Sequence, residues 1–494
     1  MNKLFSIIIF NLIISICFGN TWGHLANTGF ENQTIKSTLF FSGNWRNGVQ
    51  FYDYNPTSNT GLYTIHPSDS RHLGWSENIA FREFAIDAMI DAGINVINMS
   101  YWGLPGSDNW AYWAPMQTST ESHDELFDAA LGKNILIAPY IESYNQTGNY
   151  QGFSFMADFP GTAINPAPKF IEIIEDLIER YLITPSNSEW PEKWARVYDQ
   201  SGNERYLISI IHVASDSTEI TDQAFAEGFD NVANKVFVNT GVRIGFALDI
   251  LPKNTYAPGA YKATPLNTGV WLAVQESVLA IQCFIPEIWT GYTNEQDLIN
   301  WKANYATAWQ ATGIPFIHDI SSGYDAHIIF PSSIIYGNNN NWRNAQSQHI
   351  QDLNSQSFTF NAWNGYTEGF AGIPTLQYGD TTYKWICDIF GGTCGVSSSR
   401  EDALLNTEMI NVYPNPASSI VTVKVNLQNN SQINIKVYDS YGILQDNIYK
   451  DHIDAGVYEF QWQPPSNISS NILFFNIETH TQSSTLKVLL LPDN

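Results

Sequence analysis

Two kinds of hydrophobic pattern alternate along residues 38–390. Short runs such as ILIAPYI and GFALDIL are apolar on both faces, whereas longer stretches place apolar residues every three or four positions, as at Phe170, Ile174 and Leu177. The first pattern is typical of a β-strand buried on both faces, and the second of a helix with one apolar stripe. The sequence therefore predicts strands and helices in alternation around a buried parallel sheet.

Eight strands are predicted in this part of the chain, separated by loops and amphipathic helices. Eight such units predict an α/β fold of the (β/α)8, or TIM-barrel, class, with an open doubly wound sheet as the alternative. Capping boxes formed by Ser122 with Glu125 and by Thr293 with Gln296 predict the starts of two helices. The predicted strands are 38–45, 94–102, 135–143, 205–216, 243–251, 278–289, 315–325 and 358–363.

The pattern changes after the barrel, which we assign to residues 20–392. Residues 393–407 are rich in Ser, Gly and polar residues, which indicates a linker. Residues 408–494 contain five short alternating runs separated by turn residues and show no helical period. This region is expected to form a small all-β, immunoglobulin-like sandwich.

The first 19 residues have the composition of a secretory signal peptide. Lys3 precedes an apolar stretch that ends on the small residue Gly19. No later segment approaches the roughly 18 uninterrupted apolar residues that a membrane span needs. We therefore expect a protein without a membrane span that is secreted or held at the cell surface.

Three cysteines follow the predicted signal peptide. Cys387 and Cys394 flank a Gly-Gly turn, and in an oxidising compartment this spacing predicts a small disulfide loop. Cys283 lies in the apolar run LAIQCFIPEIW and is predicted to be a buried free thiol.

The charge balance excludes one class of partner. The chain has 23 basic and 48 acidic residues and a net charge of -25. Nucleic-acid binding needs clustered Lys and Arg, so no nucleic-acid partner is expected. Neutral or basic ligands suit this charge better, although acidity can also serve only to keep an exported protein soluble.

Acidic and aromatic residues collect at the predicted strand ends, where (β/α)8 barrels carry their chemistry. One carboxylate there can equally cap the following helix, but a group of them is typical of a catalytic site. Interleaved aromatic rings offer flat apolar faces that suit sugar rings. The carboxylate candidates are Glu142, Asp249, Glu287, Asp325 and Glu368, and the expected substrate-binding residues are Trp45, Trp102, Tyr140, His212, Trp289, His318, Asp319, Tyr324, Asn361, Trp363 and Tyr366.

Cleavage of a glycosidic bond needs two of these carboxylates. Asp249 and Glu287 end successive strands, which lie about 4.8 Å apart, so the pair suits the short spacing of a retaining enzyme. Glu287 is surrounded by apolar neighbours that raise a carboxyl pKa, so we expect it to be the acid/base and Asp249 the nucleophile. Glu142, Asp325 and Glu368 are the alternatives for either role.

Metal chemistry is a second possibility within enzymes. Asp325 and His327 share a strand face, but the sequence contains no HExxH or CxxC motif. We therefore predict no metal site and no cofactor.

The C-terminal region resembles a known module. The segments NVYPNPASSIVTVKV, INIKVYDSYG and LKVLLL are similar to the type A sorting domain that Bacteroidetes use for type IX secretion. The resemblance implies an export address and the type IX secretion machinery as a partner. A carbohydrate-binding or spacer sandwich is the alternative.

The barrel also resembles known families. It is identified as a member of a secreted bacterial family catalogued as domain of unknown function 5010, through EKWARVYDQSGNERYLISIIHVAS, GVRIGFALDILP, CFIPEIW, GIPFIHDISSGYDAHIIFPSSIIYG and FNAWNGYTEG. More distantly, IAPYIESY and WNGYTEG are similar to strand-end motifs of glycoside hydrolase families 71 and 99, barrel enzymes acting on α-glucan or α-mannan. Their Trp-Asn-x-x-x-Glu motif implies that Trp363 and Tyr366 face a sugar and that Glu368 joins the acids, although here one further residue precedes Glu368.

These observations favour a secreted glycoside hydrolase that cleaves a polysaccharide, with endo action and retention of configuration. A non-catalytic glycan-binding barrel is the alternative. A polysaccharide lyase or an esterase is a third possibility, although the sequence has no GxSxG motif.

Overall fold

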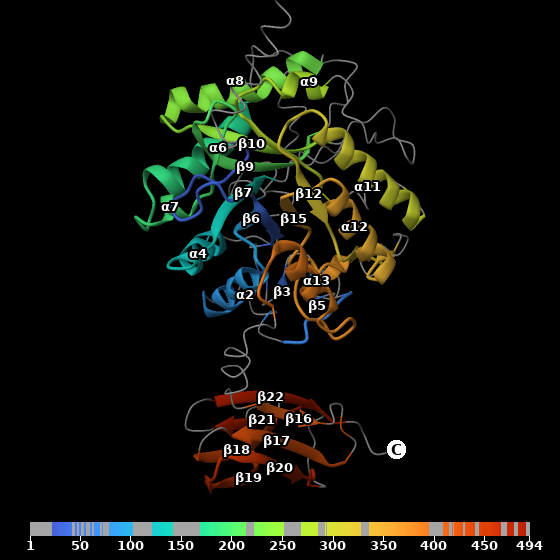
Figure 1. Cartoon of the computed structure of the whole chain (residues 1–494). Coiled ribbons are helices and arrows are strands. Elements are labelled where there is room, and N and C mark those ends of the chain that lie inside the picture. Colours follow the sequence, from blue (N-terminus) through green and yellow to red (C-terminus); the bar gives the residue numbers. More distant parts are fainter. Residues whose placement is uncertain are drawn as a thin grey trace, which may run out of the picture. The chain divides into compact units, whose positions relative to one another are not determined.

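The computed structural model divides the chain into two compact units, Met1–Cys394 and Gly395–Asn494 (Figure 1). The structure describes residues 22–41, 45–46, 49–50, 54–55, 60–61, 64–69, 72, 79–101, 121–141, 168–213, 222–250, 268–284, 292, 294–327, 335–394, 409–413, 417, 419–427, 430–439, 444–465, 472–478 and 483–490.

Eight parallel strands form the sheet of the first unit, in the order β11-β10-β9-β7-β6-β1-β15-β12. A parallel bridge between Ile281 and Phe316 joins the two ends of this order, so the sheet closes on itself. The predicted (β/α)8 barrel is confirmed, and closure excludes the open sheet. The strands are β1 (Lys36–Phe40), β6 (Val96–Tyr101), β7 (Leu136–Ile141), β9 (Glu204–Val213), β10 (Ile244–Ile250), β11 (Val278–Gln282), β12 (Ile317–Ile320) and β15 (Ser357–Phe360).

Helices surround the strands on the outside (Figure 1). Helix α11 begins after Asn294, whose side chain accepts from the Gln296 N–H at 2.8 Å. The sequence placed this cap at Thr293; Asn is the stronger N-cap residue and takes the position. Helix α4 likewise begins at Glu121, so Ser122 is not its cap. The helices are α2 (Ile79–Asp91), α4 (Glu121–Ala130), α6 (Pro168–Ile178), η3 (Glu179–Ile183), α7 (Trp190–Lys193), α8 (Asp222–Thr240), α9 (Thr268–Leu272), α11 (Glu295–Gln310), α12 (Asn340–Asp352), η4 (Tyr366–Glu368) and α13 (Thr381–Phe390).

Short strands complete the described part of the barrel unit. Strand β8 pairs antiparallel with β9, and the others form two-stranded antiparallel sheets. They are β2 (Trp45–Arg46), β3 (Val49–Gln50), β4 (Tyr54–Asn55), β5 (Thr60–Gly61), β8 (Arg196–Tyr198), β13 (Gly323–Tyr324) and β14 (Tyr336–Gly337).

The N-terminal segment seals the amino-terminal end of the barrel. Leu25 and Phe30 pack with inward-facing strand residues such as Val96 and Leu207 in one apolar cluster. The Trp22 indole donates to the Val278 carbonyl at 3.2 Å and thereby fastens the segment to a strand. The interior below the strand ends is therefore a packed core, as in other (β/α)8 barrels.

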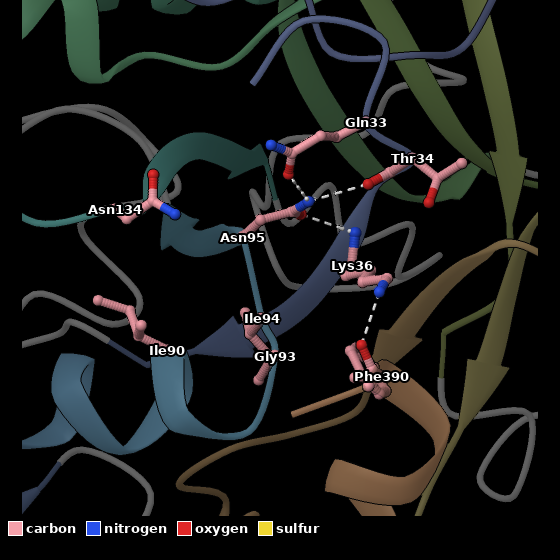
Figure 2. Close-up of a pocket in the computed structure, with 10 residues that line it drawn as sticks. Gln33, Thr34, Lys36, Ile90, Gly93, Ile94, Asn95, Asn134 and Phe390 are labelled. Carbon is pink, nitrogen blue, oxygen red and sulfur yellow. Dashed lines mark hydrogen bonds between the residues drawn. The ribbon is translucent and has the colours of Figure 1, made fainter. Parts of the chain in front are cut away.

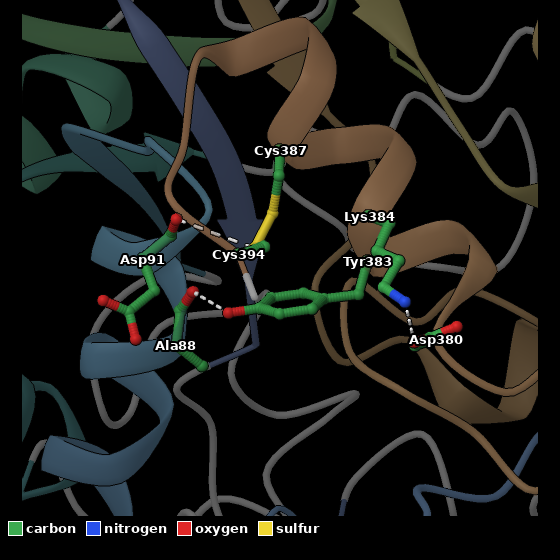
Figure 3. The surroundings of a disulfide bond; sticks show 7 residues. All are labelled: Ala88, Asp91, Asp380, Tyr383, Lys384, Cys387 and Cys394. Atoms are coloured by element: carbon green, nitrogen blue, oxygen red, sulfur yellow. Dashed lines mark hydrogen bonds and ion pairs between the residues drawn. A yellow bond between two sulfur atoms is a disulfide. The ribbon is translucent and has the colours of Figure 1, made fainter. Parts of the chain in front are cut away.

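A disulfide between Cys387 and Cys394 confirms the predicted loop, with the two Cα atoms 5.9 Å apart. Figure 3 shows it beside α2, where the Tyr383 hydroxyl donates to the Ala88 carbonyl at 3.1 Å. The Thr393 N–H donates to the Asp91 carbonyl at 2.8 Å. The last helix of the barrel is thus attached to the first described one.

The second unit is an antiparallel sandwich with one shared core. Strands β16, β17 and β20 form one sheet, and β19, β18, β21 and β22 form the other. Alternate residues of both sheets, including Val423, Ile435 and Phe475, meet in the core. The five predicted runs missed β16 and β19. Most side chains of β19 are exposed or half-buried and show no apolar alternation. The strands are β16 (Met409–Tyr413), β17 (Val421–Leu427), β18 (Ser431–Asp439), β19 (Leu444–Ile453), β20 (Gly456–Trp462), β21 (Ile472–Glu478) and β22 (Ser483–Leu489).

Within the described residues, no helix combines the length and apolar character needed to cross a membrane.

Candidate active site at the carboxyl ends of the barrel strands

The barrel interior becomes polar toward the carboxyl ends of its strands. Asn98 lies on the same face of β6 as the inner-core residue Val96, and its amide donates to the Ser37 hydroxyl at 3.2 Å. Its carbonyl accepts from the Ser209 hydroxyl at 3.3 Å. Polar side chains of three strands therefore replace the apolar core and point toward the mouth where acids are expected.

Glu368 is a buried carboxylic acid at this mouth. It ends the short helix η4, which follows β15, and Gly369 stops the turn with a left-handed φ of 78°. The Tyr324 hydroxyl donates to Glu368 Oε1 at 3.4 Å. Burial raises the pKa of Glu368 to about 7, and the Tyr324 hydrogen bond opposes this rise. With 5% of its surface exposed, the side chain is well placed to hold a proton near neutral pH.

Asp325 lies next to this acid. Its backbone N–H donates to the Glu368 carbonyl at 2.8 Å. Gly369 is required at the contact, because a Cβ atom there would lie 3.0 Å from the Asp325 backbone. The Asp325 carboxylate contacts the imidazole of His327, which is half exposed. The backbones of Asp325 and Glu368 are therefore joined by a hydrogen bond, and the Asp325 side chain in turn contacts His327.

Asp249 faces the barrel interior from the end of β10. It alternates with Ala247, which belongs to the inner core, and it is fully buried. It pairs in register with Gln282 of β11. Its placement at a strand end agrees with the sequence expectation, and its catalytic role stays a prediction.

Asp319 forms an ion pair with a lysine of helix α11, which lies outside the sheet. Lys302 of α11 places its Nζ 2.7 Å from Asp319 Oδ2, and both side chains are at most 7% exposed. The Asn361 amide donates to Asp319 Oδ1 at 2.5 Å. The ammonium also lies 3.2 Å from Gln346 Oε1. Such a buried pair is costly to break, because the remaining charge would be left without its partner.

Trp363 and Tyr366 are core residues, contrary to the expectation that they present rings to a sugar. Each is 1% exposed. The Trp363 ring packs against Gly372 and lies 6.3 Å from the Tyr383 ring of α13. Asn364 is structural as well, since its amide exchanges hydrogen bonds of 2.9 and 3.1 Å with the backbone of Phe41. Trp363 and Asn364 therefore fasten the end of β15 to neighbouring segments of the barrel. Of the residues 363–368, Glu368 is the one that supplies a carboxyl group to the mouth.

His318 also differs from the expectation. It alternates with the inward-facing residues of β12, its ring lies 5.8 Å from Phe316, and its Nδ1 is 3.2 Å from the Ser355 hydroxyl. Burial, helped by Lys302 and His349, lowers the pKa of His318 to about 3. A neutral histidine in the layer between sheet and helices does not fit a role in binding substrate hydroxyls.

Two predicted tyrosines are buried near the mouth. Tyr324 is 5% exposed and directs its hydroxyl to Glu368. Tyr140 is 1% exposed, and its ring lies 5.5 Å from Phe284, which follows β11. Six other candidates have side chains outside the described residues: Trp45, Trp102, Glu142, His212, Glu287 and Trp289.

Lys302 was missed in the sequence, although a signal for it exists. It falls on the buried stripe of α11 together with Leu298, Tyr305 and Trp309. A lysine at such a position must find a buried acceptor or an anion. The stripe therefore indicated a buried charge, but it could not indicate which acid receives it.

A pocket lies at the opposite, amino-terminal end of the barrel (Figure 2). It has a volume of about 300 Å³ and is lined by residues that include Lys36, Asn95 and Phe390. The Asn95 side chain is held by the backbone of Lys36 and Thr34 at 2.8 and 2.9 Å, and Lys36 Nζ donates to the Phe390 carbonyl at 2.6 Å. These groups stabilise the fold at the amino-terminal face of the barrel, whereas catalytic residues of (β/α)8 barrels lie at the opposite face.

No group of three or more metal-ligating side chains was found in the described part of the chain.

Residues 411–490 match the profile of a secretion system C-terminal sorting domain. The chain is exported through the type IX system to the cell surface or beyond. No curated protein sequence matches the chain.

Several solved glycoside hydrolase structures are similar to the chain. An endo-α-mannosidase of family 99 from Bacteroides thetaiotaomicron is 15% identical over 74% of this chain and 98% of its own, with a TM-score of 0.46. An endo-β-1,4-mannanase from Cellulomonas fimi is 10% identical over 82% of this chain and 89% of its own, with a TM-score of 0.40. At these values the likeness carries no functional argument, and the barrel assignment rests on the strand order. Membership of the 5010 family stays a prediction.

Proposed function

We propose that the barrel unit is a glycoside hydrolase that cleaves a polysaccharide outside the cell, with Glu368 as the proton donor. The observation that supports this is the buried carboxyl of Glu368 at the strand ends, with a pKa raised to about 7. Departure of a sugar oxygen needs a carboxylic acid that keeps its proton near the working pH. Glu368 meets this need better than the other described carboxylates, and it takes the acid role that the sequence assigned to Glu287.

The second carboxylate is proposed to be Asp249, acting as the nucleophile of a retaining reaction. Asp249 supports this role by facing the barrel interior at a strand end. Asp325 is the alternative among the described residues because it contacts the Glu368 turn directly. Glu142 and Glu287 remain further alternatives.

The proposed substrate is a neutral or basic polysaccharide attacked within the chain. A net charge of -25 disfavours the approach of polyanions. Export by the sorting domain places the barrel where polymers too large to enter a cell are found.

The test is incubation of the protein with a panel of α- and β-glycans, with new reducing ends followed by mass spectrometry. Glu368→Gln should lose about 10²-fold or more in kcat on a natural glycan and less on an aryl glycoside with a good leaving group, which departs without a proton. Asp249→Ala should be rescued by azide, because the small anion fits the space that the lost carboxylate leaves and attacks the anomeric carbon in its place. Binding of a glycan without any turnover would favour the glycan-binding alternative.

A further inference from the structure

The side-chain amide of Asn361 is held in a single orientation. Its Nδ2 lies 2.5 Å from Asp319 Oδ1 and 3.4 Å from the Cys283 carbonyl. A carboxylate and a backbone carbonyl both accept hydrogen bonds, so the NH₂ group must face them. Lys302 occupies the other oxygen of the same carboxylate at 2.7 Å, which fixes the carboxylate as well.

In this orientation the side-chain oxygen Oδ1 of Asn361 points away from Asp319 and the Cys283 carbonyl. Asn361 follows Phe358 and Phe360 of β15, of which Phe358 packs against Phe390 of α13 at 5.6 Å between ring centres. By strand alternation, Asn361 faces the barrel interior at the carboxyl end. No hydrogen bond to its Oδ1 is found among the described residues. Asn361 therefore offers an acceptor at the mouth, in the loop that also supplies Glu368.

We propose that Asn361 is a specificity-determining residue whose Oδ1 accepts a hydrogen bond from one hydroxyl of a neutral glycan, and that Asp319 and Lys302 are positioning residues that fix this acceptor. The inference rests on the proposed glycoside hydrolase function and adds a substrate requirement to it. One sugar hydroxyl must be free, because an acceptor gives no hydrogen bond to a methylated or deoxygenated position.

Asp319→Asn gives a test with a defined direction. Lys302 is a donor only, so it takes the oxygen of the new amide and leaves the NH₂ group facing Asn361. Asn361 then rotates its own oxygen toward that NH₂ and presents a donor to the mouth. The substitution should reverse the polarity of the contact while leaving the side-chain volume nearly unchanged.

The experiment uses the full chain and the oligosaccharide from the glycan panel that is cleaved fastest, together with its mono-O-methyl derivatives. In the parent protein, methylation at one hydroxyl should lower kcat/KM by about tenfold, because one hydrogen bond is lost and the Asn361 oxygen is left without a donor. In Asp319→Asn this discrimination should disappear, and KM for the unmodified oligosaccharide should rise about fivefold with little change in kcat. Asn361→Ala should give the same KM change without disturbing the ion pair, and it keeps the test valid if Asp319→Asn does not fold.

The matched control is Asn95→Ala at the opposite end of the barrel, where a buried asparagine also binds backbone groups (Figure 2). It should lower the melting temperature without changing KM or the response to methylation. Turnover in which Asp319→Asn and Asn361→Ala keep the parent KM and discrimination would overturn the inference and leave the proposed function intact. Absence of both turnover and glycan binding in the parent protein would overturn the proposed function, and this inference with it.

Discussion

Replacing Glu368 by Gln should make the barrel unit more stable relative to the parent as the pH rises. The folded protein holds this carboxyl at a pKa of about 7, against the ordinary value of 4.5. Below pH 4.5 the group is protonated in both states and contributes no difference. Between 4.5 and 7 the unfolded chain ionises while the folded chain keeps its proton, so stability is lost as the pH rises. Above 7 the loss is complete.

The size of this effect follows from the same pKa values. A change from 4.5 to about 7 corresponds to about 3 kcal/mol at 1.36 kcal/mol per pKa unit. The group is 5% exposed, so little of this is screened by solvent. Glutamine does not titrate, and the free energy of unfolding of Glu368→Gln minus that of the parent should therefore rise by about 3 kcal/mol between pH 4.5 and 7.5.

Urea unfolding followed by tryptophan fluorescence measures this difference in the full chain. The protein has 16 tryptophans, and Trp462 alone belongs to the second unit, so the signal reports the barrel. Subtracting the two curves cancels every group that both proteins share. Glu172→Gln, at an exposed position of α6, is the control for replacing one carboxylate by an amide. A difference that stays flat within about 1 kcal/mol across this range would refute the buried, protonated state of Glu368.

The activity of the parent should show the same group as a proton donor. On a natural glycan kcat/KM should fall above pH 7 as Glu368 loses its proton. Tyr324→Phe should shift this fall to higher pH, because the tyrosine hydrogen bond stabilises the ionised form of Glu368. If Tyr324→Phe does not change the pH at which kcat/KM falls, the group that titrates is another residue.

Three further predictions concern the fold and its division into units. Phe30→Ala should lower the free energy of unfolding by about 3–5 kcal/mol in urea, because Phe30 is 5% exposed in the N-terminal segment that seals the barrel; a loss below about 1 kcal/mol would show that this segment does not support the core. Removal of both Cys387 and Cys394 should cost about 2–3 kcal/mol, the chain-entropy value for so short a loop, and dithiothreitol should then have no further effect on the melting temperature. A chain ended after Cys394 should keep the glycanase activity of the full chain when made in a foreign cytoplasm and refolded with oxidant, yet fail to leave its native host; a folded but inactive product would contradict this division of labour.

The alternation of buried strands with amphipathic helices was enough to predict the barrel. Parallel strands covered on both faces require apolar residues on both sides, which produces short continuous apolar runs in the sequence, such as that of β10. The disulfide followed from spacing and compartment, and the sandwich from alternating runs. These features depend on neighbouring residues in the sequence, so the sequence alone determined them.

The roles of individual side chains were decided by contacts between distant segments. Trp363 and Tyr366 looked like sugar platforms, but both are buried, and the Trp363 ring packs against Gly372 and beside Tyr383 of α13. His318 and Asp319 are neighbours in β12, yet His318 lies on the outer face beside Ser355, whereas Asp319 lies on the inner face and binds Lys302 of α11. A pattern gives the face of a strand, whereas the environment on that face, and with it the pKa of an acid such as Glu368, depends on what the whole fold places against it.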